Sequence, residues 1–222
     1  MSAQQPSRPV HSNQRTLHPR LAKHVHRHLH SRWRKPPRPA DADALAQLDE
    51  ALATHRGPLV LDSFCGTGHS TAELARRHPG ALVIGVDKSA HRLRRHRGSG
   101  DYLLLHAHCE SVWQHLAAAG ARLAAHYILY PNPWPKAEQL ARRVHGHPAF
   151  PLLLALGGTL ELRSNWQVYV EEFGVALHLA GDRARIAVLT GAAEPLTLFE
   201  RKYRDSGHTL WQLHAALAGY PA

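Results

Sequence analysis

The 222-residue chain is predicted to fold as an α/β domain around a doubly wound, mostly parallel sheet of seven strands. Three observations predict this class. Short apolar runs alternate with segments of helical periodicity, a glycine-rich turn follows the first apolar run, and two further apolar runs close the chain. With 44% hydrophobic residues, the chain can bury one sizeable core.

The predicted elements follow one another in the order that such a sheet requires. Strands are expected at Pro58–Phe64, Ala81–Asp87, Asp101–His106, Tyr127–Tyr130 and Gly158–Arg163, and a closing antiparallel hairpin at Arg185–Thr190 and Thr209–Ala216. Helices are expected at Asp41–Thr54, His69–His78, Ser89–Arg97, Glu110–Ala119, Ala149–Leu156 and Trp166–Leu179. Parallel strands need such crossover elements between them, so the alternation favours a parallel sheet.

Residues 1–40 are predicted to form a basic N-terminal arm, and residues 41–222 the folded domain. Nine basic residues and no acidic one precede Asp41, whereas the remainder carries 18 basic and 17 acidic residues. This excess suits a polyphosphate partner, because each phosphate contact releases condensed counterions. The alternatives are a solvated tail that aids solubility and an organelle transit peptide. Six histidines and the stretch Pro36-Pro37-Arg38-Pro39 fit a transit peptide poorly.

Within the arm, residues 1–16 are expected to be disordered and a helix to follow. Apolar residues recur at every fourth position from Leu17 to Trp33, and Pro36 and Pro37 end the pattern. Four histidines alternate between His24 and His30, which invites a metal-site interpretation. Alternate residues of a helix point in different directions, so a polar surface is favoured and no metal is expected.

Composition also argues against several classes. Cys65 and Cys109 form no Cys-x-x-Cys pair, which argues against a disulfide framework and a zinc knuckle. No apolar run approaches the roughly 18–20 residues that span a bilayer. We therefore expect no membrane partner and a cytoplasmic location, and we favour a monomer.

The predicted cofactor site is the sequence Leu61-Asp62-Ser63-Phe64-Cys65-Gly66-Thr67-Gly68. Gly66 and Gly68 let the backbone turn sharply and let a ligand approach closely. A dinucleotide fingerprint would need Gly or Ala at Thr71. Asp62 stands where S-adenosylmethionine enzymes keep an acid that helps to hold the methionine end of the cofactor. S-adenosylmethionine is therefore the predicted cofactor.

The ends of the next two strands supply further candidate cofactor residues. Asp87 follows Gly68 by 19 residues and ends the second strand, where an acid accepts both ribose hydroxyls. Its alternative role is a helix N-cap. Cys109 and Glu110 follow the third strand, in the turn that usually borders an adenine ring, although Glu110 could equally be a first-turn helix acid.

The fourth strand ends in the sequence Tyr130-Pro131-Asn132-Pro133-Trp134-Pro135-Lys136. Its three prolines predict a rigid loop at the carboxyl edge of the sheet, where such folds bind their ligands. Asn132 is the candidate catalytic residue, and Trp134 offers either a stacking face or a core plug. Lys136, Arg142 and Arg143 are the candidate phosphate contacts.

These motifs resemble those of the tRNA (guanine-N(7))-methyltransferase family. The family carries Pro-Asp-Pro-Trp, then a Lys and two arginines, an Asp-Trp pair after the fifth strand, and Thr-x-Phe-Glu near the C-terminus. This chain carries Pro131–Trp134, Asn165-Trp166 and Thr197–Glu200 in the same order, and the resemblance covers about residues 58–217. It implies a Rossmann-like class I methyltransferase and an RNA substrate, most specifically tRNA. It also implies that Asn165 belongs to the substrate site and that Thr197 and Glu200 reach over the cofactor and the target base.

Two departures bear on specificity, because Asn132 and Asn165 replace aspartates of the family pattern. A carboxylate accepts two hydrogen bonds from the N1–H and amino edge of guanine, whereas Asn offers one acceptor oxygen. Glu200 could supply the missing acceptor. Guanine N7 carries no proton to remove, so positioning should supply most of the rate, and His69, His106 and His108 receive no catalytic role. The alternatives are methylation of another base or a small molecule, and an RNA-binding relative that has lost turnover.

Overall fold

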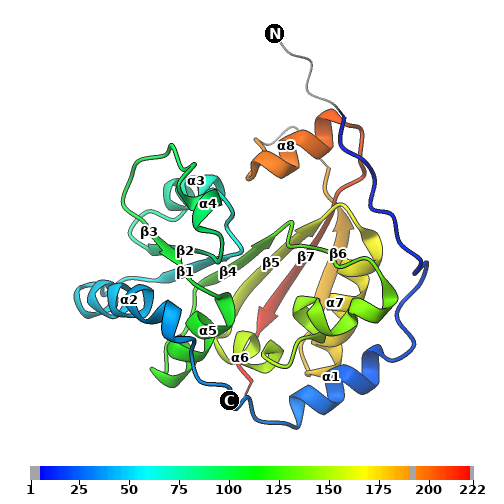
Figure 1. Ribbon diagram of the computed structural model, residues 1–222, viewed down its shortest axis with the longest axis horizontal. Helices are drawn as coiled ribbons and strands as arrows, with labels where there is room; N and C mark the ends of the chain where they lie inside the picture. The colour runs from blue at the N-terminus through cyan, green and yellow to red at the C-terminus, as the bar shows by residue number, and fades with distance from the viewer. Residues whose placement is uncertain (1–5, 191–193, 221–222) are drawn as a thin grey trace.

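The structure, a computed structural model, describes residues 6–190 and 194–220. Its centre is a seven-stranded sheet in the order β3-β2-β1-β4-β5-β7-β6 (Figure 1). Strands β1 to β5 are parallel, and β7 pairs antiparallel with both β5 and β6. The strands are β1 (Leu59–Ser63), β2 (Leu82–Asp87), β3 (Leu103–His106), β4 (Ala125–Leu129), β5 (Gly158–Ser164), β6 (Ala184–Val188) and β7 (Trp211–Leu217). The predicted fold class and closing hairpin are confirmed.

The helices cover both faces of this sheet, as a doubly wound fold requires. They are α1 (Leu21–Leu29), α2 (Ala42–Thr54), α3 (His69–Arg77), α4 (Ala90–Leu93), α5 (Cys109–Ala118), α6 (Phe150–Ala155), α7 (Gln167–Leu179) and α8 (Leu198–Asp205). Three short 3₁₀ turns, at Pro39–Asp41, Ala137–Arg142 and Val144–Gly146, complete the connections.

Three helices differ from expectation. Helix α1 spans Leu21–Leu29 and is shorter than the apolar pattern from Leu17 to Trp33 predicts, and Leu17 is 41% exposed. Helix α4 ends at Leu93, although the sequence predicts helix to Arg97. Its continuation would stack Arg92, Arg94, Arg95 and Arg97 within two turns, and like charges at this spacing destabilise a helix. Helix α8 was not predicted, although Thr197 and Glu200 have the spacing of a capping box, and the Thr197 hydroxyl accepts a hydrogen bond from the Glu200 amide.

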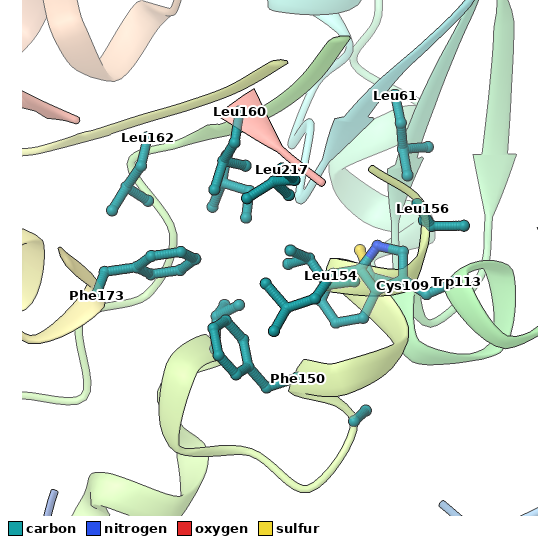
Figure 2. Packing of buried hydrophobic residues seen from close by; sticks show 14 of the residues in the cluster. Leu61, Cys109, Trp113, Phe150, Leu154, Leu156, Leu160, Leu162, Phe173 and Leu217 are labelled. Atoms are coloured by element: carbon teal, nitrogen blue, oxygen red, sulfur yellow. The ribbon is translucent and has the colours of Figure 1, made fainter. Parts of the chain in front are cut away.

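Alternate residues of each strand divide the hydrophobic core between the two faces. Leu61 of β1 belongs to the larger cluster, which packs α1, α2, α5, α6 and α7 against the sheet. Figure 2 shows Phe150 and Leu154 of α6 in this cluster with Phe173 of α7 and leucines of the sheet. Val60, the next residue along β1, faces the smaller cluster with Leu74 of α3.

The N-terminal segment is docked against the domain. Residues 1–16 were expected to be disordered, which is wrong for residues 6–16, while residues 1–5 lie outside the described part. The Gln14 side chain is buried and donates a hydrogen bond to Glu172 of α7. Leu21, Val25 and Leu29 of α1 join the larger core cluster. Apolar contacts and buried hydrogen bonds therefore hold this basic segment, which composition alone marked as an arm.

The histidines of α1 have unequal surroundings. Burial lowers the pKa of His28 to about 4, so this ring is neutral at neutral pH. Across the described residues, no three His, Cys, Asp or Glu side chains converge in a geometry that could hold a metal ion. Within the same ranges, every helix is too short or too polar to cross a bilayer.

Candidate active site

A cavity of about 860 Å³ opens at the carboxyl ends of β1, β2 and β4. The chain winds from β1 through β2 to β3 on one side and resumes with β4 on the other, so the cavity lies where the strand order reverses. Its walls come from the loops after β1, β2 and β4 and from the first turns of α5 and α8. This volume accommodates a nucleoside-sized ligand together with part of a second one.

The backbone is strained around this cavity. Among the described residues, the non-glycine residues with a positive φ are Phe64 at 65°, Tyr130 at 53° and Trp134 at 46°. All three line the cavity. A left-handed conformation is costly for aromatic residues and persists where surrounding contacts impose it, most often at functional sites. The strain therefore marks the loops after β1 and β4 as the functional walls.

The glycines of the first loop have different tasks. Gly66 lines the cavity with φ 63°, and a Cβ there would meet nothing within 4 Å. Gly68 is the N-cap of α3 with φ 74°, and a Cβ there would lie 2.8 Å from Leu104. Gly66 thus forms the turn that faces the ligand, whereas Gly68 fits α3 against β3 without lining the cavity.

Asp62 lies beneath this loop and is outside the cavity lining. Its Oδ2 accepts hydrogen bonds from the hydroxyls of Ser70, at 2.7 Å, and Thr71, at 2.8 Å. Its Oδ1 is buried and has no partner among the described residues. Burial raises the pKa of Asp62 to about 6, against the opposing effect of the two hydroxyls. Thr71, which departs from the dinucleotide pattern, is therefore used to hold this acid.

Asp87 lies at the cavity wall, where the sequence predicts a ribose contact. Its Oδ2 accepts from the Gly66 amide at 3.0 Å and from Arg92 at 2.9 Å, and its Oδ1 accepts from the Ser89 amide at 2.8 Å. Ser89, and not Asp87, caps α4. Asp87 therefore joins the glycine loop to the loop after β2.

Cys109 and Glu110 open α5 and both line the cavity, as predicted. The Cys109 thiol is buried and points back to the Val86 carbonyl at 3.8 Å, and burial raises its pKa. Phe64 packs edge-on against Trp113 beside them, with ring centroids 5.9 Å apart. Phe64, Cys109 and Trp113 give this wall an apolar surface beside Glu110, which suits an adenine-sized ring.

The proline loop, defined here as Tyr130–Lys136, forms the opposite wall. Asn132 and Trp134 line the cavity, and the Asn132 side-chain oxygen accepts a hydrogen bond from the Trp134 amide at 3.3 Å. Arg142 lies over the Trp134 ring, 4.9 Å from its centroid, and also lines the cavity. The structure thus brings together Asn132, Trp134 and Arg142.

Arg143 is not a phosphate contact, contrary to the expectation. Its side chain is 0% exposed and donates to Glu172 Oε2 at 2.5 Å, to the Trp134 carbonyl at 3.1 Å and to Gln14 Oε1 at 3.0 Å. Lys136 is exposed outside the cavity, and its carbonyl also accepts from Arg143. The two neighbouring arginines therefore separate, because Arg143 satisfies a buried carboxylate.

The Thr-x-Phe-Glu motif also differs from its implied role. Glu200 is 0% exposed and forms ion pairs with Arg163 of β5 and with Arg204, so it neither reaches over the cavity nor replaces the acceptor missing at Asn132. Thr197 lines the cavity and caps α8. Asn165 lies outside the cavity lining, with its amide 3.2 Å from His208 Nδ1. The ion pairs with Arg163 and Arg204 hold Glu200 away from the cavity, because a buried carboxylate needs compensating charge.

Several lining residues were missed by sequence reasoning. Phe199, which is 50% exposed, projects from α8, and six cations also line the cavity. These cations are Arg38, Lys88, Arg92, Arg95, Arg201 and Lys202. The capping-box spacing at Thr197 could have predicted α8, but no local signal distinguishes these cations from other surface arginines and lysines.

Strand order, the glycine loop and acids at the ends of β1 and β2 define a class of enzymes, the α/β methyltransferases that bind a nucleoside cofactor. Solved structures support the fold. The 16S rRNA methyltransferase KamB matches with a TM-score of 0.56 at 19% identity, covering 78% of this chain and 93% of that one. The 16S rRNA (adenine(1408)-N(1))-methyltransferase of Catenulisporales acidiphilia matches with 0.55 at 18%, covering 78% and 91%.

The sequence comparisons define the family. The family model described as "Putative methyltransferase" matches residues 56–213. The tRNA (guanine-N(7)-)-methyltransferase of Thiobacillus denitrificans is 31% identical over 177 residues, which cover 74% of this chain and 77% of that protein. The enzyme of the same name from Leifsonia xyli is 29% identical over 188 residues, covering 78% and 81%. The chain belongs to the methyltransferase family that includes these tRNA (guanine-N(7)-)-methyltransferases.

Proposed function

We propose that the protein transfers the methyl group of S-adenosylmethionine to N7 of a guanine in tRNA. The observation that carries the proposal is one cavity whose lining joins a glycine loop suited to a nucleoside, an aromatic wall and several cations. Relatives named as tRNA guanine-N7 enzymes match about three quarters of the chain, which supports this choice of substrate. A cytoplasmic location and a monomeric state stay predictions.

The residues at the glycine loop fit the cofactor. The buried Asp62 Oδ1 has no partner among the described residues and is an acceptor for the amino group of the methionine end. Gly66 faces the cavity without a side chain, and Asp87 offers carboxylate oxygens for the ribose. Cys109 and Phe64 supply the apolar wall for the adenine. When bound, the cofactor supplies an electrophilic methyl group on a sulfonium.

The residues of the opposite wall orient the base. Trp134 offers a ring face, Arg142 adds positive charge beside it, and Asn132 presents an amide. Guanine N7 has a free lone pair and no proton to lose, so these residues would only have to hold the base in line with the methyl group that the cofactor would supply. Burial lowers the pKa of His69, so this cavity histidine is neutral at neutral pH and adds no competing charge. Catalysis then rests on alignment and on exclusion of water.

The cations of the cavity lining suit the phosphates of a folded RNA. Arg201 and Lys202 lie on α8, and Lys88, Arg92 and Arg95 follow β2, so positive charge flanks the cavity from two sides. Each phosphate that is neutralised releases counterions, which makes such binding steeply dependent on salt. A small-molecule substrate would not need charge spread this widely.

The proposed function is tested with the purified full chain, methyl-labelled S-adenosylmethionine and unmodified tRNA. Digestion to nucleosides should place the label in 7-methylguanosine. Asp87→Asn is the matched control for cofactor dependence and should lower the yield at limiting cofactor. Label in another nucleoside would redirect the assignment to another base. Cofactor binding without any label transfer would favour a relative that has lost turnover.

Asn132 favours a second candidate, methylation of a different base. Its side-chain oxygen is occupied by the Trp134 amide, which leaves the amide NH₂ as the group available to a base. This NH₂ group can donate a hydrogen bond to an acceptor atom of a base. The carboxylate of the family pattern cannot, because it only accepts. If guanine is the target, Asn132→Asp should raise 7-methylguanosine formation by roughly ten-fold, the worth of about one base hydrogen bond. If another base is the target, the same substitution should abolish the native product.

A further inference from the structure

The N-terminal segment reaches both walls of the substrate side of the cavity. This segment, called the strap and defined as Ser7–His18, runs from the end of α8 down the side of the molecule to α1 (Figure 1). At its middle, Ser12 donates a hydrogen bond to the Pro135 carbonyl, and Asn13 Oδ1 accepts one from the Ala137 amide at 3.0 Å. Pro135 lies in the proline loop and Ala137 directly follows it, so both contacts hold the C-terminal end of this loop.

A buried ionic network connects the strap to the same loop from the inside. Gln14 donates to Glu172 Oε1 at 2.6 Å and accepts from Arg143 at 3.0 Å, and the His18 amide donates to Glu172 Oε1 at 2.8 Å. Arg143 in turn donates to the carbonyls of Trp134, at 3.1 Å, and Lys136, at 3.2 Å. Arg143 and Glu172 are both 0% exposed.

Charge within this network is balanced. Burial alone would raise the pKa of Glu172, but the hydrogen bond from His145 and the positive charge of Arg143 lower it to about 2. Burial lowers the pKa of His145, so Arg143 supplies the charge that balances Glu172. Glu172 is therefore ionised at neutral pH and holds the Arg143 guanidinium in place. Four of the five N–H groups of Arg143 donate to these partners, so the guanidinium holds the two loop carbonyls in one position.

The other end of the strap holds α8. The Ser7 amide donates to the Ser206 hydroxyl at 2.8 Å, and His208 Nε2 donates to the Ser7 carbonyl at 3.0 Å. The His208 ring stacks on Tyr203 at 5.3 Å between centroids, and Tyr203 stacks on Phe199 at 6.1 Å. Contacts with the strap are thus relayed to the aromatic residue that α8 projects into the cavity.

We propose that the strap is a positioning element that sets the separation of the proline loop from α8 and thereby aligns the target base. Ser12, Asn13 and Gln14 act as positioning residues, because they contact the loop or Arg143 and lie outside the cavity lining. The proline loop needs such support. Tyr130 and Trp134 hold positive φ angles, and a loop of this kind keeps them where external contacts impose them. The inference rests on the proposed function for its kinetic readout.

The test compares two double variants of the full chain. Ser12→Ala with Asn13→Ala removes both loop contacts, whereas Ser12→Thr with Asn13→Asp keeps a hydroxyl donor and a carboxyl acceptor. Both residues are partly or fully exposed, so the variants should fold. With tRNA and S-adenosylmethionine saturating, the alanine variant should lose roughly ten- to hundred-fold in kcat, the cost of a misplaced reacting group. The conservative variant should retain wild-type kcat, and His11→Ala, in the exposed part of the same strap, is the matched control.

A second measurement separates positioning from general stability. Cofactor affinity by calorimetry and the Tm should stay near wild type in the alanine variant, while amide hydrogen exchange in residues 130–137 should accelerate. Unchanged kcat and unchanged exchange would overturn the inference, as would a loss of kcat that parallels losses in Tm and cofactor affinity. The exchange measurement needs no turnover. If the wild type does not methylate tRNA, the proposed function fails. The exchange measurement still shows whether the strap restrains the proline loop.

Discussion

Two carboxylates at neighbouring strand ends have different surroundings, and the surroundings decide what each can do. Asp62 is fully buried beneath the glycine loop, with one oxygen shared by two hydroxyls and the other without a partner among the described residues. Asp87 lies at the cavity wall and accepts three hydrogen bonds. Asp62 therefore has an oxygen that can still accept hydrogen bonds, whereas most acceptor positions of Asp87 are already used.

Asp62 makes stability depend on pH. Burial raises its pKa from about 3.8 to about 6, so the folded protein holds this proton more tightly than the unfolded chain. The resulting stabilisation is complete below the unfolded pKa and is lost as the pH rises through the folded pKa. The free energy of unfolding should therefore fall by on the order of 3 kcal/mol from about pH 4 to pH 7 through this group.

Asp62→Asn should remove this part of the pH profile, because the amide cannot ionise. Denaturant unfolding of the cofactor-free protein at several pH values measures it. Asp43→Asn, on the exposed side of α2, is the matched control and should reproduce the wild-type profile. A wild-type profile in Asp62→Asn would mean that this carboxyl is solvated in solution.

If Asp87 holds the ribose as proposed, Arg92 competes with the cofactor for this carboxylate. A carboxylate offers about four acceptor positions, three are used, and a ribose diol needs two. The two backbone donors are fixed by their loops, so the Arg92 side chain, which is 47% exposed, is the one that can leave. Arg92→Ala should strengthen S-adenosylmethionine binding by up to about five-fold, the worth of an exposed ion pair.

Calorimetry with S-adenosylmethionine checks this expectation. Arg95→Ala removes a cavity cation that has no hydrogen bond to Asp87 among the described residues, and it should leave the affinity unchanged. Weaker cofactor binding in Arg92→Ala would show that the guanidinium holds Asp87 in its binding geometry.

At the scale of elements, α8 forms one wall of the cavity. Eight residues are too few for a helix to be stable alone, so its anchors determine its position. Thr197 caps it, Glu200 ties it to Arg163 of β5, and Phe199 faces the cavity. Thr197 and Glu200, the first and last residues of the Thr-x-Phe-Glu motif, therefore anchor α8. Phe199, its third residue, faces the cavity.

Thr197→Ala should loosen the first turn of α8, because losing a cap costs about 1 kcal/mol. Amide exchange in residues 198–201 should accelerate, and KM for tRNA should rise while the affinity for S-adenosylmethionine changes little. Thr197→Ser keeps the hydroxyl acceptor and should behave as wild type. Equal exchange rates in Thr197→Ala and Thr197→Ser would show that the Thr197 cap does not stabilise the first turn of α8.

At the scale of the whole molecule, the basic N-terminal segment is part of the core and of the cavity support. Deleting residues 1–39 would remove three buried aliphatic side chains, each worth roughly 1.5–3 kcal/mol, together with the Gln14 contacts. Truncation is therefore a poor test of RNA binding, because it should unfold much of the protein. Charge substitutions in the full chain are the better test.

The position of a cation relative to the cavity should decide its contribution to RNA binding. Arg8 and Arg15 are exposed and lie on the strap, whose Ser12 and Asn13 contact Pro135 and Ala137, whereas Arg20 and Lys23 lie at the start of α1. Arg8→Gln with Arg15→Gln should reduce the slope of log K against log salt by roughly 0.7–0.9 per lost contact. Arg20→Gln with Lys23→Gln is the matched pair and should leave the slope near wild type. Equal effects would mean that the segment acts as a diffuse charge.

Local sequence by itself determined the sheet, its flanking helices and the position of the cofactor loop. Apolar runs, glycines at a tight turn and acids at strand ends are local signals, because each reflects the backbone and burial of a few consecutive residues. They placed Asp87, Cys109, Glu110, Asn132 and Trp134 at the carboxyl edge of the sheet, where the structure has them. The antiparallel pairing of the last two strands was also predicted, although α8 lies between them in the chain.

Tertiary structure decided which charged residues meet the ligand. Arg142 and Arg143 are neighbours in sequence, yet one stacks on Trp134 and the other is buried against Glu172. Glu200 matches a family motif and is withdrawn by Arg163, while the strap, marked by composition as a disordered tail, is held by Gln14 and Glu172. Each outcome depends on a partner distant in sequence, because a buried charge goes where an opposite charge and hydrogen bonds offset its desolvation.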